Sequence, residues 1–383
     1  MMKQLILTIG LLVSLFCSFA QNGLGYYTDV NNQFVIFEKG NIFPAERTKV
    51  DSIHLGDDYI SYIDALGNLK IFSNGELKVL EETFPNAIYA LSNALAYKMQ
   101  QRLMICEKGI KKELTKWAGF VIVHQEIVVW QNMPSMDLMA YVNGEIYTIE
   151  KAVEYKTIKE YKIGRNVFAY NDLNNHMKIF YNGKVYDTET SNILTFKCGK
   201  NTVAYYDEFY HEFKVFQNGS FTTLCTFQPK QYDVADDMVA YLDINEYFSV
   251  FYNGNIKRLL SYKPNSFRAI NNMLLFYDFG DIGNMGNYRE FDVFYKGEVY
   301  KLEKFIPKKE ALVGFNSLLY FDNNGRIKYF NNAKMNENIL IEKPNKVLLD
   351  RDLPFFRYAN FTIAFFYNEK LYEYSGVKRN IEH

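Results

Sequence analysis

One short phrase recurs along the whole chain and constrains its fold more than any other feature. The clearest copy is FKVFQNGSFTTL, residues 213–224, in which two aromatic-rich segments meet at Asn218-Gly219. This dipeptide is typical of two-residue β-hairpins, because both central residues of a type I′ turn need a positive φ, which Asn and Gly tolerate. The phrase therefore predicts an antiparallel hairpin, and its recurrence predicts a repeat protein.

Ten copies of the phrase follow one another at a nearly constant spacing. Measured between the residues at the turn glycine position, the intervals are 35, 34, 35, 39, 36, 35, 43, 36 and 43 residues. These anchors are Gly40, Gly75, Gly109, Gly144, Gly183, Gly219, Gly254, Gly297, Ala333 and Gly376, the last two in the degraded copies IKYFNNA and KLYEYSG. A period of this length indicates a repeat architecture covering nearly the whole chain.

Each period contains four predicted strands. Within residues 231–260 the strands are QYDVA, MVAYLD, FSVFYN and NIKRLL, with turns at Asp236-Asp237 and Asn253-Gly254. They are short, rich in β-branched and aromatic residues, and bounded by turn residues. The second and third strands place apolar side chains at neighbouring positions, which is typical of a sheet covered on both faces. Helical periodicity with capping residues does not occur after the N-terminal leader.

These features predict an all-β fold, a β-propeller built from about ten short four-stranded blades of about 35–43 residues, because stacked blades cover both faces of each sheet. The repeat resembles propeller blades in general, without the Trp-Asp signature of WD40 repeats or the Asp-box of sialidases. A single ring is favoured over two smaller rings, since no linker rich in Pro, Gly or Ser divides the chain. The first copy begins near its second strand and the last ends soon after its third, so we expect closure to combine strands from both ends.

The N-terminus has the pattern of a secretory signal peptide. A basic n-region precedes the apolar run from Leu5 to Phe16, and Ser18-Phe19-Ala20 forms a small-x-small cleavage site. The run is too short to span a membrane, so we predict a signal peptide over residues 1–20 and a propeller domain over residues 22–383. No later apolar stretch reaches the length of a membrane span. We expect a periplasmic protein, with secretion as the alternative and no direct membrane insertion.

The net charge limits the kinds of partner that we expect, and the cysteine content bears on whether disulfides stabilise the fold. The formal net charge is −1, from 43 basic and 44 acidic residues, which argues against nucleic acid as a partner. The three cysteines left after processing are Cys106, Cys198 and Cys225. Their odd number and wide spacing indicate small buried hydrophobic residues rather than a disulfide framework, with a single bridge left open.

An aspartate recurs at the end of the second strand. The members of this series are Asp29, Asp64, Asp172, Asp207, Asp243, Asp278 and Asp322. A metal or catalytic role is one interpretation. Because the position recurs in blade after blade, we favour a structural role in which each carboxylate accepts backbone N–H bonds from the loop that follows.

The residues that could support chemistry form no recognisable constellation. The five histidines match no zinc motif, and no nucleophile elbow or phosphate-binding loop occurs. Glu154, Asp233 and Asp236 are carboxylates that could meet near the ring centre, where a glycosidase needs a pair roughly 5–9 Å apart. We favour ordinary turn or tunnel roles for them. The sequence thus predicts no catalytic residue, no metal and no cofactor.

Two tryptophans flank the irregular stretch WAGFVIVHQEIVVW, at Trp117 and Trp130. Aromatic side chains of this kind stack on sugars in some proteins. We favour packing in the core for both, because large aromatic side chains bury well between blades.

The eighth copy carries an insertion, DFGDIGNMGNYRE, over residues 278–290. Its acids do not alternate as in a calcium loop, so a metal site is disfavoured. A long loop on a rigid scaffold is typical of a contact surface, although a tolerated insertion is the alternative. As anchors for a protein partner we predict Ile282, Met285 and Tyr288.

Two functions remain open. The first is a non-enzymatic protein-protein interaction scaffold, because a rigid repeat array offers broad faces and one elaborated loop, and no catalytic constellation occurs in the sequence. Gln21 directly after the cleavage site resembles exported proteins of the Bacteroidota, which implies that the partner is an envelope or outer-membrane protein complex. One candidate role is an accessory, plug-like subunit that occludes or supports the channel of the type 9 secretion translocon. The chain stops after the last repeat, without the sandwich-like domain of cargo of that system, so we expect it to stay in the periplasm. The alternative is a carbohydrate-active or carbohydrate-binding propeller with its ligand at the ring centre.

Overall fold

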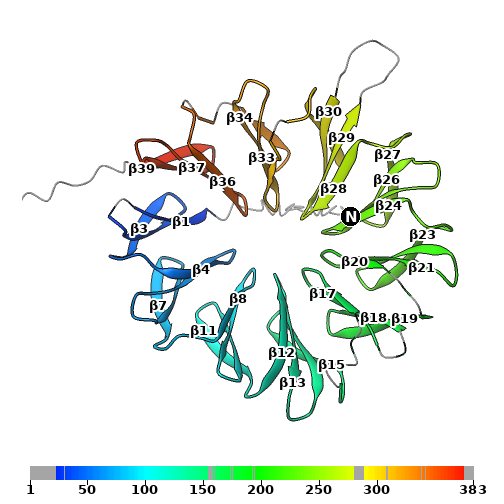
Figure 1. Cartoon of the computed structure of the whole chain (residues 1–383), viewed down its shortest axis with the longest axis horizontal. Coiled ribbons are helices and arrows are strands. Elements are labelled where there is room, and N and C mark those ends of the chain that lie inside the picture. The colour runs from blue at the N-terminus through cyan, green and yellow to red at the C-terminus, as the bar shows by residue number, and fades with distance from the viewer. Residues whose placement is uncertain are drawn as a thin grey trace, which may run out of the picture.

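The computed structural model describes residues 23–374, apart from Val30, 154–157, 159, 173, 175, 192, 194, 280–288, 308, 338 and 341. All regular elements in this part of the chain are β-strands, and they form ten antiparallel sheets arranged in one ring (Figure 1). Nine sheets have four strands and the first has three. The predicted fold class is therefore confirmed. No helix in the described residues is long and apolar enough to cross a membrane.

The first five blades cover residues 24–191. Blade 1 contains β1 (Leu24–Thr28), β2 (Phe34–Glu38) and β3 (Asn41–Glu46). Blade 2 contains β4 (Asp51–Leu55), β5 (Tyr59–Ile63), β6 (Leu69–Ser73) and β7 (Glu76–Glu81). Blade 3 contains β8 (Ala87–Ala90), β9 (Ala94–Met99), β10 (Arg102–Glu107) and β11 (Ile110–Thr115). Blade 4 contains β12 (Ala118–His124), β13 (Ile127–Asn132), β14 (Asp137–Val142) and β15 (Glu145–Glu150). Blade 5 contains β16 (Glu160–Ile163), β17 (Val167–Asn171), β18 (His176–Tyr181) and β19 (Lys184–Ser191).

The last five blades cover residues 196–374. Blade 6 contains β20 (Phe196–Cys198), β21 (Thr202–Asp207), β22 (Glu212–Gln217) and β23 (Ser220–Cys225). Blade 7 contains β24 (Gln231–Ala235), β25 (Met238–Leu242), β26 (Phe248–Tyr252) and β27 (Asn255–Leu260). Blade 8 contains β28 (Ser266–Ile270), β29 (Met273–Phe279), β30 (Arg289–Tyr295) and β31 (Glu298–Glu303). Blade 9 contains β32 (Leu312–Val313), β33 (Ser317–Phe321), β34 (Ile327–Asn331) and β35 (Lys334–Asn336). Blade 10 contains β36 (Lys346–Asp350), β37 (Leu353–Arg357), β38 (Ile363–Tyr367) and β39 (Lys370–Tyr374).

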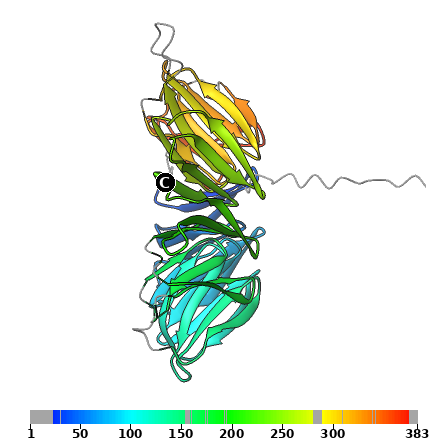
Figure 2. The ribbon, with the colours of Figure 1, turned by 90° about the vertical axis from the view of Figure 1, so that its right-hand side faces the viewer.

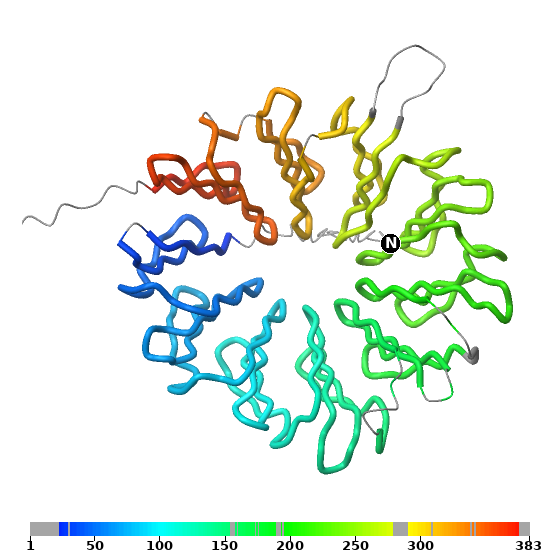
Figure 3. The backbone as a smooth tube through the Cα atoms, viewed as in Figure 1, coloured from blue at the N-terminus to red at the C-terminus, as the bar shows by residue number. Residues whose placement is uncertain are grey.

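Each four-stranded blade is a meander from an innermost strand A to an outermost strand D, after which the chain returns to the centre. Seen edge-on, the blades form a disc (Figure 2). The backbone trace shows that the first blade lies directly beside the last (Figure 3). The four strands predicted over residues 231–260 correspond to β24–β27.

Burial explains why the middle strands lack polar alternation. All five side chains of β5, β17 and β25 are buried, because each second strand has a neighbouring blade on both faces. The outermost strand is different, and the first four residues of β27 are exposed. The hydrophobic core is therefore divided among the spaces between successive blades.

The turns between strands C and D have the predicted geometry. At Asn218-Gly219 the two φ angles are 50° and 87°, as a type I′ turn requires. Both central residues have positive φ in all ten blades, including Asn332-Ala333 and Asn368-Glu369. The tenth anchor, Gly376, was wrong: the last turn uses Glu369, and Gly376 lies outside the described residues. The error arose because the glycine itself served as the marker, whereas Glu369 takes the left-handed conformation in this copy.

The expected exchange of strands between the two ends is also wrong for the described residues. Blade 10 is complete from one continuous segment, β36–β39, because LYEY belongs to the fourth strand and not to the third. Blade 1 consists of strands B, C and D only, and no described strand pairs with the inner edge of β1. Aromatic packing joins the two blades, with the rings of Phe37 and Phe365 stacked 4.4 Å apart between centroids.

Candidate functional site

The ring centre is built by the turns between strands A and B. One such turn comes from each blade that has a strand A, and we call them the A–B turns. They comprise residues 56–58, 91–93, 125–126, 164–166, 199–201, 236–237, 271–272, 314–316 and 351–352. All nine lie on the same side of the disc, because every blade repeats the same strand order.

Hydrogen bonds join each A–B turn to the next. Backbone bonds run from Asp57 N–H to the Ser92 carbonyl (2.6 Å), from Ser92 N–H to Gln125 (2.5 Å) and from Glu126 N–H to Arg165 (2.9 Å). Side chains join later turns: the Asn166 amide oxygen accepts the Asn201 N–H at 2.8 Å. The turns are therefore tied directly to one another, not only through the packed blades.

The second half of the circle continues the same pattern. The Asp236 N–H donates to the Asn271 carbonyl at 2.7 Å, and the Asn271 side-chain amide donates to the Gly314 carbonyl at 2.8 Å. The Asn316 N–H donates to the Asp352 carboxylate at 2.8 Å. The chain of turns thus reaches blade 10 without a break.

One arginine closes this circle across blade 1. The Arg351 guanidinium donates to the Leu55 carbonyl at 2.7 Å and forms an ion pair with Asp57, both in blade 2. Among the described residues blade 1 supplies no A–B turn, and the long Arg351 side chain spans that position. The Arg351 side chain is only 18% exposed, which places this ion pair in a largely dehydrated setting.

A second arginine crosses the centre from blade 5. Arg165 donates to Glu126 at 2.6 Å and to Asp236 at 3.1 Å. Its guanidinium lies 4.9 Å from the ring centroid of Phe315, and that of Arg351 lies 5.3 Å from the same ring. Phe315 therefore contacts two cations, an attraction that strengthens when water is excluded.

A cavity of about 350 Å³ opens beside this cluster. Its lining is mostly charged or amide, including Arg165, Lys200, Asp237 and Asn316. Burial raises the pKa of the Asp237 carboxyl, partly offset by a hydrogen bond from Asn201. Burial lowers the pKa of Arg351 to about 10, partly offset by Asp352. Both shifts reflect the limited hydration of the ring centre.

Glycines allow the A–B turns to approach so closely. A Cβ on Gly199 would lie 2.0 Å from the Ala235 carbonyl oxygen, and one on Gly314 would lie 1.8 Å from the Arg351 carbonyl oxygen. Both contacts are with backbone, which cannot move aside as a flexible side chain can. A larger residue would push neighbouring turns apart.

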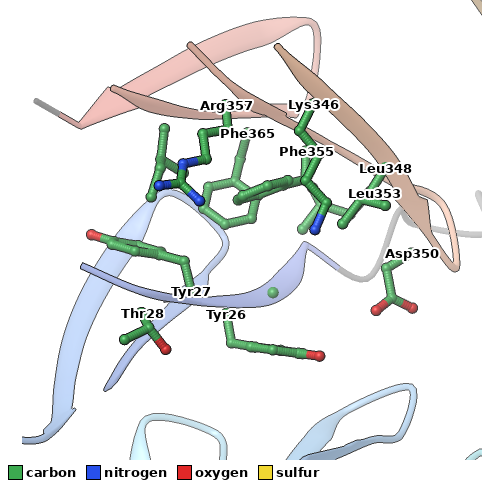
Figure 4. A pocket seen from close by; sticks show the side chains of 12 residues that line it. Tyr26, Tyr27, Thr28, Lys346, Leu348, Asp350, Leu353, Phe355, Arg357 and Phe365 are labelled. Atoms are coloured by element: carbon green, nitrogen blue, oxygen red, sulfur yellow. The ribbon is translucent and has the colours of Figure 1, made fainter. Parts of the chain in front are cut away.

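A second hollow lies at the seam between blades 1 and 10. It is a groove of about 290 Å³ lined by β1 and by the strands of blade 10. Figure 4 shows Tyr27 on the blade 10 side of β1 with Arg357 and Phe365, while Leu348 and Leu353 lie further along the groove. This groove occupies the place where a strand A of blade 1 would lie.

The decisive comparison concerns the number of blades. The sequence matches the family model of the 10-bladed beta propeller domain over residues 18–372. The chain belongs to this family. No curated protein matches the sequence.

Several solved structures are similar to this 10-bladed propeller. The computationally designed Ika8 protein is 12% identical, with 74% of this chain and 96% of that chain covered and a TM-score of 0.30. PorZ, an essential surface component of the type-IX secretion system of Porphyromonas gingivalis, is 11% identical (87% and 52% covered, TM-score 0.26). The ACR4 WD40 ectodomain of Arabidopsis thaliana is 10% identical (63% and 91% covered, TM-score 0.30). The propeller spans about half of PorZ, and likenesses at this level carry no argument about function.

The predicted carboxylates are engaged in structural contacts. The Asp236 carboxylate accepts hydrogen bonds from the Arg165 guanidinium and from the Lys200 N–H. Asp236 is buried, whereas a residue in an ordinary turn or tunnel position was expected to be solvated. Asp233 accepts from Lys197 at 3.1 Å and from the Ala269 N–H at 2.9 Å. Glu154 lies outside the described residues. These contacts give Asp233 and Asp236 a role in joining blades.

The aspartate series has the predicted structural role in six of its seven members. Asp64 is typical, since one carboxylate oxygen accepts the N–H groups of Leu66 and Asn68, both at 2.9 Å. Backbone N–H groups of the following loop are also bound by Asp29, Asp172, Asp207, Asp243 and Asp322. Asp278 differs because β29 extends past it, and its carboxylate accepts a hydrogen bond from the Tyr262 hydroxyl.

The predicted burial of the tryptophans and cysteines is confirmed for some of these residues and wrong for others. Trp130 is buried as predicted, but Trp117 is 52% exposed, so a core role for it is wrong. Trp117 lies between β11 and β12, where the chain passes from one blade to the next, and its neighbours cover only about half of it. All three cysteines are free, which rules out a disulfide among them, and only Cys106 is fully buried.

The predicted anchors Ile282, Met285 and Tyr288 lie outside the described residues. The strands that flank them remain paired up to Phe279 and Arg289. Among the described residues, no group of three or more His, Cys, Asp or Glu side chains is placed to hold a metal.

Sequence reasoning missed Arg165, Phe315 and Arg351. A signal for two of them exists in the sequence, because GRN, GKN and GFN recur at residues 164–166, 199–201 and 314–316. This G-x-N pattern marks an A–B turn. Its variable middle residue, which is Arg165 in one copy and Phe315 in another, faces the ring centre.

Proposed function

We propose that this protein is a non-enzymatic interaction subunit of a protein complex in the bacterial envelope. The observation that carries the proposal is the inner edge of blade 1. In the described part of the chain the A–B turns are tied together around the ring, yet no strand pairs with β1 on the side that borders the seam groove. A rigid scaffold with an unused edge is suited to binding another protein, because little order must be created on binding.

The contacts at the ring centre favour binding over catalysis. Asp233 and Asp236 already accept hydrogen bonds from basic side chains and backbone N–H groups. A general acid or base has to exchange a proton with a substrate, and these carboxylates are occupied in joining blades.

The finer parts of the proposal rest on the sequence. The leader over residues 1–20 supports export, and the resemblance to Bacteroidota envelope proteins supports a periplasmic subunit of an outer-membrane complex. Within such a complex, a broad disc could occlude or support the mouth of a protein-secretion channel. The insertion over residues 280–288, with Ile282, Met285 and Tyr288, is a second candidate contact.

The test is affinity purification of tagged protein from native envelopes in mild detergent, followed by mass spectrometry. We expect a stoichiometric outer-membrane partner. Recovery of the protein alone, as a monomer, would contradict the proposal.

A loop variant separates the insertion from the rest of the surface. Replacing residues 280–288 by Asn-Gly keeps the β29–β30 pair, because Phe279 and Arg289 are already opposite each other. The Tm should stay unchanged while the partner is recovered in lower yield. Equal recovery would remove the insertion from the interface.

A carbohydrate ligand at the ring centre remains the second candidate, and the polar cavity of about 350 Å³ favours it. A glycan array, followed by calorimetry with any hit, tests it. Binding that is lost in Asp237→Asn but kept in the exposed variant Glu298→Gln would support this reading.

A further inference from the structure

The first blade presents an open β-edge with a defined register. In an antiparallel pair, alternate residues direct their backbone groups toward the partner strand. Gly23 accepts from Lys39, and Asp29 donates to Gln33 on the β2 side, so residues 23, 25, 27 and 29 face β2. The backbone groups of Leu24, Tyr26 and Thr28 therefore point to the opposite edge, where no described strand pairs with β1.

The neighbouring blade has the matching uncovered face. In β36, alternate residues Lys346, Leu348 and Asp350 are exposed, and all three line the seam groove. Leu348 is 42% exposed. In several other blades the corresponding face meets the innermost strand of the next blade, as β4 meets β8 and β24 meets β28.

The charge of the groove changes along its length, from positive at one end to negative at the other. Arg357 lies opposite Lys346 in the β36–β37 pair, so positive charge gathers where β36 begins. The apolar Leu348 follows, and Asp350 supplies negative charge where the strand ends. An innermost strand of blade 1 would run parallel to β36, since it must be antiparallel to β1. A strand that complements these charges therefore carries, from its N-terminus and at every second residue, an acidic, then an apolar and then a basic side chain.

We propose that an extended segment of a partner protein binds here as the missing innermost strand of blade 1. The segment pairs with Leu24, Tyr26 and Thr28 through its backbone, as in other cases of strand addition. Its alternate side chains, acidic, then apolar, then basic, face Lys346, Leu348 and Asp350. This inference rests on the proposed interaction function and specifies the class of partner.

The first experiment measures binding of a labelled peptide by fluorescence anisotropy. The probe is acetyl-Ser-Glu-Thr-Val-Thr-Lys-Thr-Ser, and its control exchanges the Glu and Lys. We expect saturable binding of the probe and at least tenfold weaker binding of the control. The double variant Lys346→Glu, Asp350→Lys should reverse this preference. Equal binding of both peptides, or no saturable binding, would overturn the proposal.

The backbone contribution is tested at Thr28, which is exposed. Proline is tolerated where an N–H faces an open edge, so Thr28→Pro should keep the β1–β2 pair while removing one donor and blocking strand addition. Thr28→Ala is the matched control. We expect Thr28→Pro to weaken peptide binding at least tenfold relative to Thr28→Ala at an unchanged Tm, and equal affinities would count against strand addition.

Hydrogen exchange of the protein without peptide tests whether another part of the molecule fills the position. We expect the amides of Leu24, Tyr26 and Thr28 to exchange faster than those of Gly25 and Tyr27, and to slow when the peptide binds. Slow exchange of all five in the free protein would overturn the proposal. Envelope purification with Thr28→Pro distinguishes failure of the strand-addition site from failure of the interaction function. If the partner is still recovered in full, the interaction function stands and the strand position is refuted.

Discussion

Arg351 in the last blade forms an ion pair with Asp57 in the second blade, although 294 positions separate them in the sequence. This pair closes the circle of A–B turns across blade 1, for which the described part of the chain contains no innermost strand. A closed ring requires contacts between its first and last blades. Contacts between residues so distant in the sequence carry a large entropic cost of loop closure. We therefore expect the seam to be the most sensitive part of the fold.

Removing either member of this pair should destabilise the protein. Arg351→Ala and Asp57→Ala should each lower the free energy of unfolding by about 2–4 kcal/mol, because each leaves a largely buried charge without its partner. The double variant should show a coupling of about 1–3 kcal/mol in urea unfolding. The exposed pair Lys334–Glu369 is the control, with a coupling below about 1 kcal/mol. Equal coupling in both pairs would show that the seam has no special role.

A methyl group at the ring centre should be poorly tolerated. Gly199→Ala places a Cβ 2.0 Å from the Ala235 carbonyl oxygen, and the forced separation of two turns should cost about 2–4 kcal/mol. Gly254→Ala is the control, because Gly254 has a φ of 78° but no atom within 4 Å of the added Cβ. The control should cost only about 1 kcal/mol, from backbone strain. Equal losses of Tm would contradict close packing of the turns.

The loop aspartates should contribute stability that depends on pH. Burial opposes ionisation of Asp64, but hydrogen bonds from Asn68 and Lys70 outweigh it and lower the pKa to about 2. Because the folded-state pKa is lowered, the contribution is present above about pH 4 and is lost as the pH falls toward 2. Asp64→Asn should therefore cost about 2 kcal/mol at pH 7 and much less near pH 2.5. A cost that is independent of pH would show that the charge is unimportant.

Asp292 should behave in the opposite way. It is buried in β30, and its Oδ1 atom has no hydrogen-bond partner among the described residues. Burial, reinforced by Glu290, raises its pKa to about 6. Because the folded-state pKa is raised, the ionised form destabilises the fold, and stability falls as the pH rises from about 4 to about 6.

Asp292→Asn should accordingly raise the free energy of unfolding by about 1–3 kcal/mol at pH 7.5 and have little effect at pH 4. Thermal unfolding at both pH values measures this. Glu298→Gln, at an exposed side chain of the neighbouring strand, removes the same charge and should change stability by less than about 0.5 kcal/mol. A lower Tm for Asp292→Asn at pH 7.5 would refute the assignment.

Much of the fold was predictable because its determinants are local. The turn at Asn218-Gly219 needs only two adjacent residues with positive φ, and Asp64 needs only the N–H groups two and four residues ahead. Where a local marker was absent, the prediction failed: Glu369 replaces glycine in the last turn, and the error shifted the assignment of the final strands.

The candidate site was less predictable for the same reason. Arg165 in blade 5 contacts Phe315 in blade 9, four blades further along the chain, and Arg351 reaches from blade 10 to blade 2. Neither contact has a spacing that a repeat pattern specifies. The open edge at Leu24, Tyr26 and Thr28 likewise becomes visible only once the strands are counted blade by blade.

The sequence by itself determined the unit: a four-stranded antiparallel blade of about 35 residues, with its turns, its doubly covered middle strands and its recurring aspartates. These features depend on backbone preferences and hydrogen bonds within a few residues, so each copy specifies them independently. The tertiary structure alone decided how the copies close into one ring, which inner strand edge has no partner among the described strands, and which side chains meet at the centre. Those outcomes depend on contacts between residues up to 296 positions apart, and no local pattern encodes such contacts.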